Sequence, residues 1–143
     1  MKKGSTLVEG IMSMSLLLIA LTLCTQIFII STKSIDLREK KEEANRLSYA
    51  IENEIKYNVS FEDINNSFVN GRLSLKYKED ILNSLLVTSL LSLERGNEIV
   101  IKREIDNSTE EKYKISTFKI TIYNSKWGIL DERIFIKSYW MDI

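Results

Sequence analysis

Glu9 is the residue whose setting most strongly indicates a chemical role. It is followed by 23 residues, 10–32, that carry no charge, and the only cations before it are Lys2 and Lys3. A carboxylate at the edge of such an apolar run is costly unless it is paired, and charged groups in this position are usually functional. Glu9 therefore requires a partner, and the sequence after Lys3 offers no cation nearby.

The sequence lacks the residues and motifs that usually indicate a catalytic, metal-binding or cofactor-binding site. There is no His, so the usual general base and the commonest metal ligand are absent, and a single cysteine, Cys24, cannot form an intramolecular disulfide. No phosphate-binding glycine loop, nucleophile elbow or zinc-binding helix motif is present. We expect no enzymatic activity and no cofactor.

The charge balance also narrows the range of partners. The 143 residues carry 20 Lys+Arg and 20 Asp+Glu, which argues against a nucleic-acid binder driven by bulk positive charge. One acidic stretch could ligate Ca²⁺ through hard oxygens. It contains Asp106, Asn107, Glu110 and Glu111. Because it lacks a defined ligand spacing, a polar hairpin turn is the favoured interpretation.

The uncharged run predicts the element that would position Glu9. At about 1.5 Å per residue, a helix of this length reaches roughly 35 Å, enough to cross a bilayer core of about 30 Å. The run contains no Pro, and its one glycine, Gly10, stands at its start. We predict a membrane-spanning helix, with Lys2 and Lys3 holding the N-terminus on the cytoplasmic side by the positive-inside rule.

Three other interpretations of this segment fit the residues less well. A cleaved secretory signal would have a shorter apolar core and a small-x-small cleavage site. A lipoprotein signal that uses Cys24 would not place the bulky Leu23 directly before the cysteine. A plain one-span anchor explains the lysines and the apolar run but gives no role to Glu9.

The residues that precede the run resemble a known leader. Residues 2–9 read Lys-Lys-Gly-Ser-Thr-Leu-Val-Glu, which closely resembles the class III leader of type IV pilins and pseudopilins. That family has a short basic leader ending in Gly, then a variable residue, Thr, Leu, any residue and Glu, followed by a long apolar helix. The chain departs from the family at Ser5, where Phe or Met is commoner, and in lacking the mid-helix Pro of many major pilins.

The resemblance implies a processing step. A membrane-embedded aspartic peptidase, the prepilin peptidase, would cut after Gly4 and methylate the new amine on Ser5. Lys2 and Lys3 would supply the charge of the discarded leader, residues 1–4. A glycine at the cut suits this step, because it allows close backbone approach and extended conformations.

The resemblance also implies an assembly role for a transmembrane helix over residues 5–33. The carboxylate at the position of Glu9 pairs in the family with the N-terminal amine of a neighbouring subunit, and Thr6 and Leu7 belong to the same motif. The implied partners are other pilin or pseudopilin subunits, an assembly platform protein and a cytoplasmic ATPase. The chain would begin as a single-pass membrane protein and end in an extracytoplasmic filament of a type IV pilus, type II secretion or competence machine.

Residues 34–143 are expected to form an extracytoplasmic domain, the headgroup. The helix continues to about Tyr57 as an amphipathic helix, with apolar residues three or four apart. These residues are Ala44, Leu47, Ile51 and Ile55. A turn or short helix is expected near Ser60, with Asp63 as a capping signal, and Asn65, Asn66, Asn70 and Gly71 indicate a loop. A short strand with Leu73, Leu75 and Tyr77 comes next, and the run 81–90 fits either a helix or a buried strand.

The last third of the chain predicts strands. Residues 98–105, 113–123 and 133–141 are rich in Ile, Val and aromatic residues, and Phe118, Ile120 and Ile122 should share one face. In the third strand Ile134, Ile136 and Trp140 should oppose Phe135, Tyr139 and Met141. Short polar linkers at 106–111 and 124–131, the latter with Gly128 in a turn, favour an antiparallel meander. The predicted fold is α+β: a long N-terminal helix packed on a small antiparallel sheet, as in pilins.

An alternative function remains open at this point. The chain could be a single-span membrane-anchored protein with an extracytoplasmic binding or sensing domain. Glu9 discriminates the two interpretations, because a filament subunit requires its carboxylate and a plain anchor does not.

Overall fold

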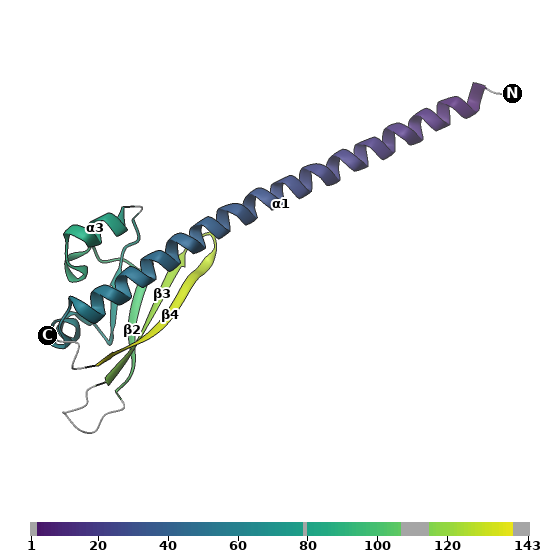
Figure 1. The fold of residues 1–143 in the computed structure, drawn as a ribbon. Coiled ribbons are helices and arrows are strands. Elements are labelled where there is room, and N and C mark those ends of the chain that lie inside the picture. The colour runs from purple at the N-terminus through teal and green to yellow at the C-terminus, as the bar shows by residue number, and fades with distance from the viewer. Residues whose placement is uncertain (1–2, 79, 107–114, 139–143) are drawn as a thin grey trace. The chain divides into compact units, whose positions relative to one another are not determined.

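The structure is a computed structural model that describes residues 3–78, 80–106 and 115–138 (Figure 1). The elements are α1 (Lys3–Tyr57), α2 (Phe61–Ser67), β1 (Arg72–Leu75), α3 (Ile81–Val87), the 3₁₀ turn η1 (Leu90–Ser92), β2 (Ile99–Asp106), β3 (Ile115–Asn124) and β4 (Gly128–Ser138). The α+β prediction is confirmed. The chain divides into two units, Met1–Glu39 and Lys40–Ile143.

In the second unit, α1 buries one stripe of its surface against the sheet. Ala44, Leu47, Ile51 and Ile55 are all at most 1% exposed, as their spacing predicts. The opposite face carries charge, including the ion pair between Arg46 and Glu42. In Figure 1 this part of α1 lies along the strands.

The sheet is a four-stranded antiparallel meander with the strand order β1-β2-β3-β4. Its inner face supplies much of the rest of the core, including Leu73 and Ile101, and the short helices add Ile64, Ile81 and Leu90. Phe118, Ile120 and Ile122 are fully buried on this face, so their predicted alternation is confirmed. Phe118 stacks on Phe135 of the neighbouring strand, with ring centroids 5.5 Å apart.

The predicted linker at 124–131 is wrong in its extent, because β4 begins at Gly128. The Asn124 side-chain oxygen accepts hydrogen bonds from the backbone N–H groups of Lys126 and Trp127, at 2.8 and 3.3 Å. Gly128 has a φ of 74°, which a residue without Cβ adopts at little cost. These contacts close the chain reversal early, and the paired strand starts five residues before the predicted position.

The pattern of β4 left open which of its two faces is buried. Phe135 and Lys137 point into the core, whereas Ile134 and Ile136 are 58% and 51% exposed. Trp140, Tyr139 and Met141 belong to the predicted strand but lie outside the described residues.

The segment between α1 and β2 follows most of its local signals. Two predictions are wrong: Asn65 and Asn66 belong to α2 and not to a loop, and β1 ends at Leu75, before Tyr77. Ser60 caps α2, because its hydroxyl oxygen accepts the backbone N–H of Asp63 at 3.0 Å. The ambiguous run after residue 80 forms the short helix α3 and then the turn η1, which resolves the choice in favour of helix.

A buried lysine joins β4 to the end of α1. The Nζ of Lys137 donates to the carbonyl oxygens of Ile55, at 2.9 Å, and Val59, and lies 5.3 Å from the centroid of the Phe61 ring. The last carbonyls of a helix have no intrahelical partner. Lys137 therefore satisfies the carboxyl end of α1 with a cation, which the helix dipole also favours.

We expect Lys137→Met to lower the free energy of unfolding by about 1–3 kcal/mol, because the carbonyls would lose their charged donor inside the core. Denaturant unfolding of the full chain in detergent, followed by tryptophan fluorescence, measures the change. Lys41→Met is the matched control, since Lys41 is exposed and forms no ion pair with any described residue. Equal stability of the two variants would show that Lys137 does not anchor the helix end.

Candidate functional site

The predicted processing and assembly residues lie at the start of α1. The described helix includes Lys3, Gly4, Ser5 and Thr6, while Lys2 lies outside the described residues. Leu7 is 69% exposed. Glu9 is also exposed, and it forms no ion pair with any residue that the structure describes.

Glu9 stands at the beginning of an apolar surface that extends all round the helix. Every large apolar side chain from Leu7 to Ile30 is between 49% and 71% exposed. An apolar surface of this extent is typical of contact with a membrane or with other proteins. By length and composition, α1 is the one described helix that could cross a membrane.

The hydroxyl groups within this segment are satisfied by the helix itself. Ser13 donates to the carbonyl oxygen of Glu9 at 2.8 Å, and Ser15 donates to that of Ile11 at 2.7 Å. Thr22 and Thr32 make equivalent bonds one turn back. Such bonds let polar side chains enter an apolar environment without an unpaired donor. The Glu9 carboxylate is the only charged group between residues 7 and 32.

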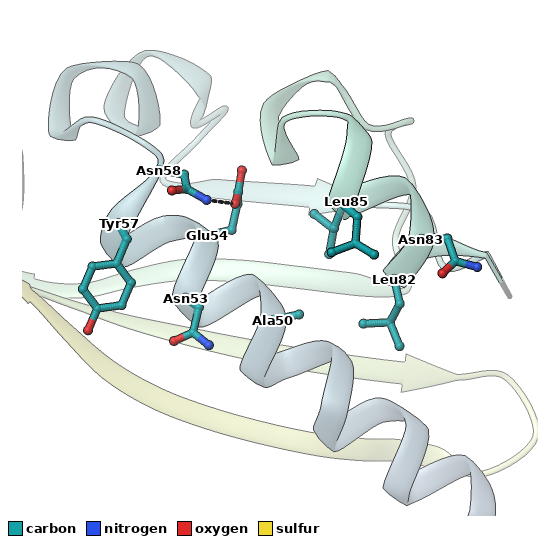
Figure 2. A pocket seen from close by; sticks show the side chains of 9 residues that line it. Ala50, Asn53, Glu54, Tyr57, Asn58, Leu82, Asn83 and Leu85 are labelled. Carbon is teal, nitrogen blue, oxygen red and sulfur yellow. Dashed lines mark hydrogen bonds between the residues drawn. The ribbon is translucent and has the colours of Figure 1, made fainter.

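A groove in the second unit forms where α3 lies beside α1 (Figure 2). It encloses about 450 Å³. Leu82 and Leu85 of α3 point toward Ala50 of α1 across it. At the free end of α3, Leu86 and Val87 are 85% and 89% exposed.

Most polar side chains of this groove come from the end of α1 and the residue after it, and α3 adds Asn83. The Glu54 carboxylate accepts a hydrogen bond from the amide of Asn58, and Asn53 lies one turn from Tyr57 along the same wall. Its lining has no nucleophile next to a general base. The leucine side chains and the amide groups of the groove suit contact with an apolar, amide-bearing surface.

The sequence contained only a partial signal for this groove. The spacing of Leu82, Leu85 and Leu86 is helical, but it could not show that a helix of seven residues would lie beside α1.

Metal binding finds no support in the described residues. They contain no group of three or more His, Cys, Asp or Glu side chains that could hold a metal ion. The side chains of the acidic segment Asp106–Glu111 lie outside the described residues, so the calcium alternative stays a prediction.

No protein-family model, curated protein or solved structure matches this chain. The architecture alone therefore defines its class: a long apolar N-terminal helix that continues into a unit with a small antiparallel sheet.

Cys24 provides a natural probe of the environment of the apolar segment. We expect its exposed thiol to resist a charged, membrane-impermeant maleimide in lipid vesicles, whichever way the chain is inserted, and to react once detergent is added. A thiol in the hydrocarbon core is inaccessible to a charged reagent, because a charge is costly to bring into lipid. The control combines Cys24→Ser with Lys41→Cys and should label rapidly in intact vesicles in those molecules whose second unit lies outside, and completely once detergent is added. Rapid labelling of Cys24 in intact vesicles would contradict a membrane span.

Proposed function

We propose that this chain is a structural subunit, a minor pilin or pseudopilin, of a type IV pilus, type II secretion or competence filament. The observation that carries the proposal is the position of Glu9: a carboxylate with no ion pair among the described residues, at the start of an uncharged helix surface over residues 10–32. The leader-like residues before it and the small antiparallel sheet after the helix support the same conclusion.

Processing would occur at the first turn of α1. The prepilin peptidase would cut after Gly4 and methylate the new amine of Ser5, removing Lys2 and Lys3 with the leader. Both residues at the cut are helical in the structure, so the turn must unwind to enter a peptidase. Gly4 eases this step, because glycine is about 1 kcal/mol less favourable than alanine in a helix.

Assembly would then bring together two groups that are costly apart. The processed chain presents a new amine at Ser5 and the carboxylate of Glu9, and an amine from a neighbouring subunit would neutralise the latter. Since removing either charge leaves the other unpaired in a medium of low dielectric constant, the pair acts as a device that sets the register between subunits. Glu9 positions the subunit and takes no part in catalysis.

The remaining parts of the proposal follow from the two surfaces of α1. The exposed apolar segment would store the subunit in the membrane and then pack against the helices of other subunits in the filament. A platform protein and a cytoplasmic ATPase would drive that transfer. The second unit would be the extracytoplasmic headgroup.

A membrane-anchored binding protein is the alternative function, and the groove between α1 and α3 favours it. That function requires the span and the headgroup but gives no role to the Glu9 carboxylate. The two proposals therefore differ in the effect of a single charge.

We expect Glu9→Gln to reduce incorporation into filaments by at least about tenfold, because loss of one ion pair in lipid exceeds the roughly 1.4 kcal/mol that corresponds to this factor. The measurement is the amount of the chain in sheared filaments from cells that carry the cognate machine, relative to the amount in the membrane. Cleavage of the leader should be unaffected.

The matched control is Glu39→Gln, which removes an exposed carboxylate from the same helix outside the apolar segment. It should incorporate normally. Normal incorporation of Glu9→Gln would refute the pairing and favour the membrane-anchored binding protein.

A further inference from the structure

A second hollow, of about 260 Å³, lies at the start of β1 and differs in chemistry from the groove beside α3. Its polar lining consists of Arg72, Arg95, Asn70, Asn97, Ser67 and Ser74. None of its lining residues carries a negative charge. Two arginines and two asparagines thus border one small space.

One wall of the hollow is a tight turn. Val69 and Arg72 exchange two backbone hydrogen bonds, at 2.9 and 3.2 Å. The two residues between them, Asn70 and Gly71, have φ values of 54° and 73°. Two positive φ angles in an Asn-Gly pair are typical of a type I′ hairpin turn, so the backbone of Arg72 is firmly placed.

The other wall, which carries Arg95, is hydrogen-bonded to β1 and its extension. The N–H of Lys76 donates to the carbonyl of Glu94 at 2.9 Å, and Leu75 forms a bridge with Arg95. A Cβ on Gly96 would lie 2.5 Å from the Cα of Lys76, so this close approach requires glycine. The two arginines therefore come from backbone segments that are fixed to each other, which lowers the cost of binding a ligand.

Neither arginine has a partner in the described part of the chain. Arg72 and Arg95 form no ion pair or side-chain hydrogen bond there. The neighbouring Glu94 is occupied by Lys78 and Lys76, whose hydrogen bonds lower the pKa of its carboxyl. The carboxylate of Glu98, also close to the loop, accepts the backbone N–H of Asn97 at 3.1 Å.

The sheet adds a third cation beside Arg72. Lys102 lies directly opposite Arg72 in the β1–β2 register, and like charges in this position destabilise a sheet. The next residue in this row, Lys119, is compensated by Glu132 at 2.7 Å, which raises the pKa of the Lys119 ammonium. The Arg72–Lys102 pair has no such compensation among the described residues.

We propose that this hollow binds an oxyanion, a phosphate or sulfate group. Arg72 and Arg95 would donate N–H groups to its oxygens in the forked geometry that suits such groups. The Asn70 and Asn97 side chains would supply further donors, and Lys102 would add positive potential. The group comes from a soluble phosphate or from the headgroup of an anionic lipid. This site is independent of the proposed filament role.

The test is NMR titration of the full chain in maltoside micelles, following the Nε–H signals of Arg72 and Arg95 and the amides of Gly96 and Asn97. One arm adds inorganic phosphate at constant ionic strength, with chloride as the balancing anion. The other arm adds phosphatidylglycerol to phosphate-free micelles. Saturable shifts with inorganic phosphate support a soluble source, and saturable shifts with the lipid alone support the headgroup. No saturable shift in either arm overturns the proposal.

Arg72→Gln and Arg95→Gln should each weaken binding about tenfold, the size expected for one charge-assisted hydrogen-bonding group. Arg46→Gln, which removes an exposed arginine from α1, should not change the affinity. Equal weakening by Arg46→Gln would indicate diffuse charge attraction and overturn the site.

Thermal unfolding without ligand gives an independent readout of the same site. Lys102→Gln should raise the midpoint, because it relieves the repulsion from Arg72. A lowered midpoint would contradict the uncompensated like-charge pair on which the site is built.

Discussion

The structure depends on one constraint: a single helix must present two different surfaces. Over residues 7–32, α1 exposes apolar side chains on all sides, and hydroxyl groups such as those of Ser13 and Ser15 bond back to its own carbonyls. Beyond residue 40 it is apolar on one stripe only, from Ala44 to Ile55, and that stripe is buried. No other described residue buries the first surface, whereas the sheet packs against the second.

The second unit uses charged groups to fix the helix to β4. Arg133 donates to the Glu52 carboxylate at 3.1 Å and to the side-chain oxygen of Asn45 at 2.7 Å. The Nζ of Lys56 donates to the other carboxylate oxygen of Glu52. Lys137 closes the end of the helix from the same strand. With no disulfide available to a chain that has one cysteine, these contacts and the apolar core must hold helix and sheet together.

Much of this fold could be predicted from the sequence, because local patterns and burial agree. The spacing of Leu47, Ile51 and Ile55 gave the buried face of α1, and the alternation around Ile120 gave the inner face of β3. The early start of β4 could not be predicted, because the Asn124 side chain and a glycine with positive φ replace a loop that composition suggested.

The two candidate sites also differ in how far the sequence reveals them. Glu9 is recognisable in sequence, because its meaning comes from the uncharged residues next to it. The oxyanion hollow is not, because Arg72 and Arg95 are 23 positions apart in sequence and their backbone segments are joined by the pairing of β1 and its extension with residues 94–96. Likewise, no pattern revealed that Lys137, rather than an apolar residue, would occupy the core.

The proposed filament role rests on the idea that the first residues are a leader for a prepilin peptidase. The most direct measurement is the mass of the N-terminal peptide after expression with and without that peptidase. With the peptidase, the peptide should begin at a methylated Ser5 and lack residues 1–4. A peptide that still begins at Met1 in its presence would contradict the account.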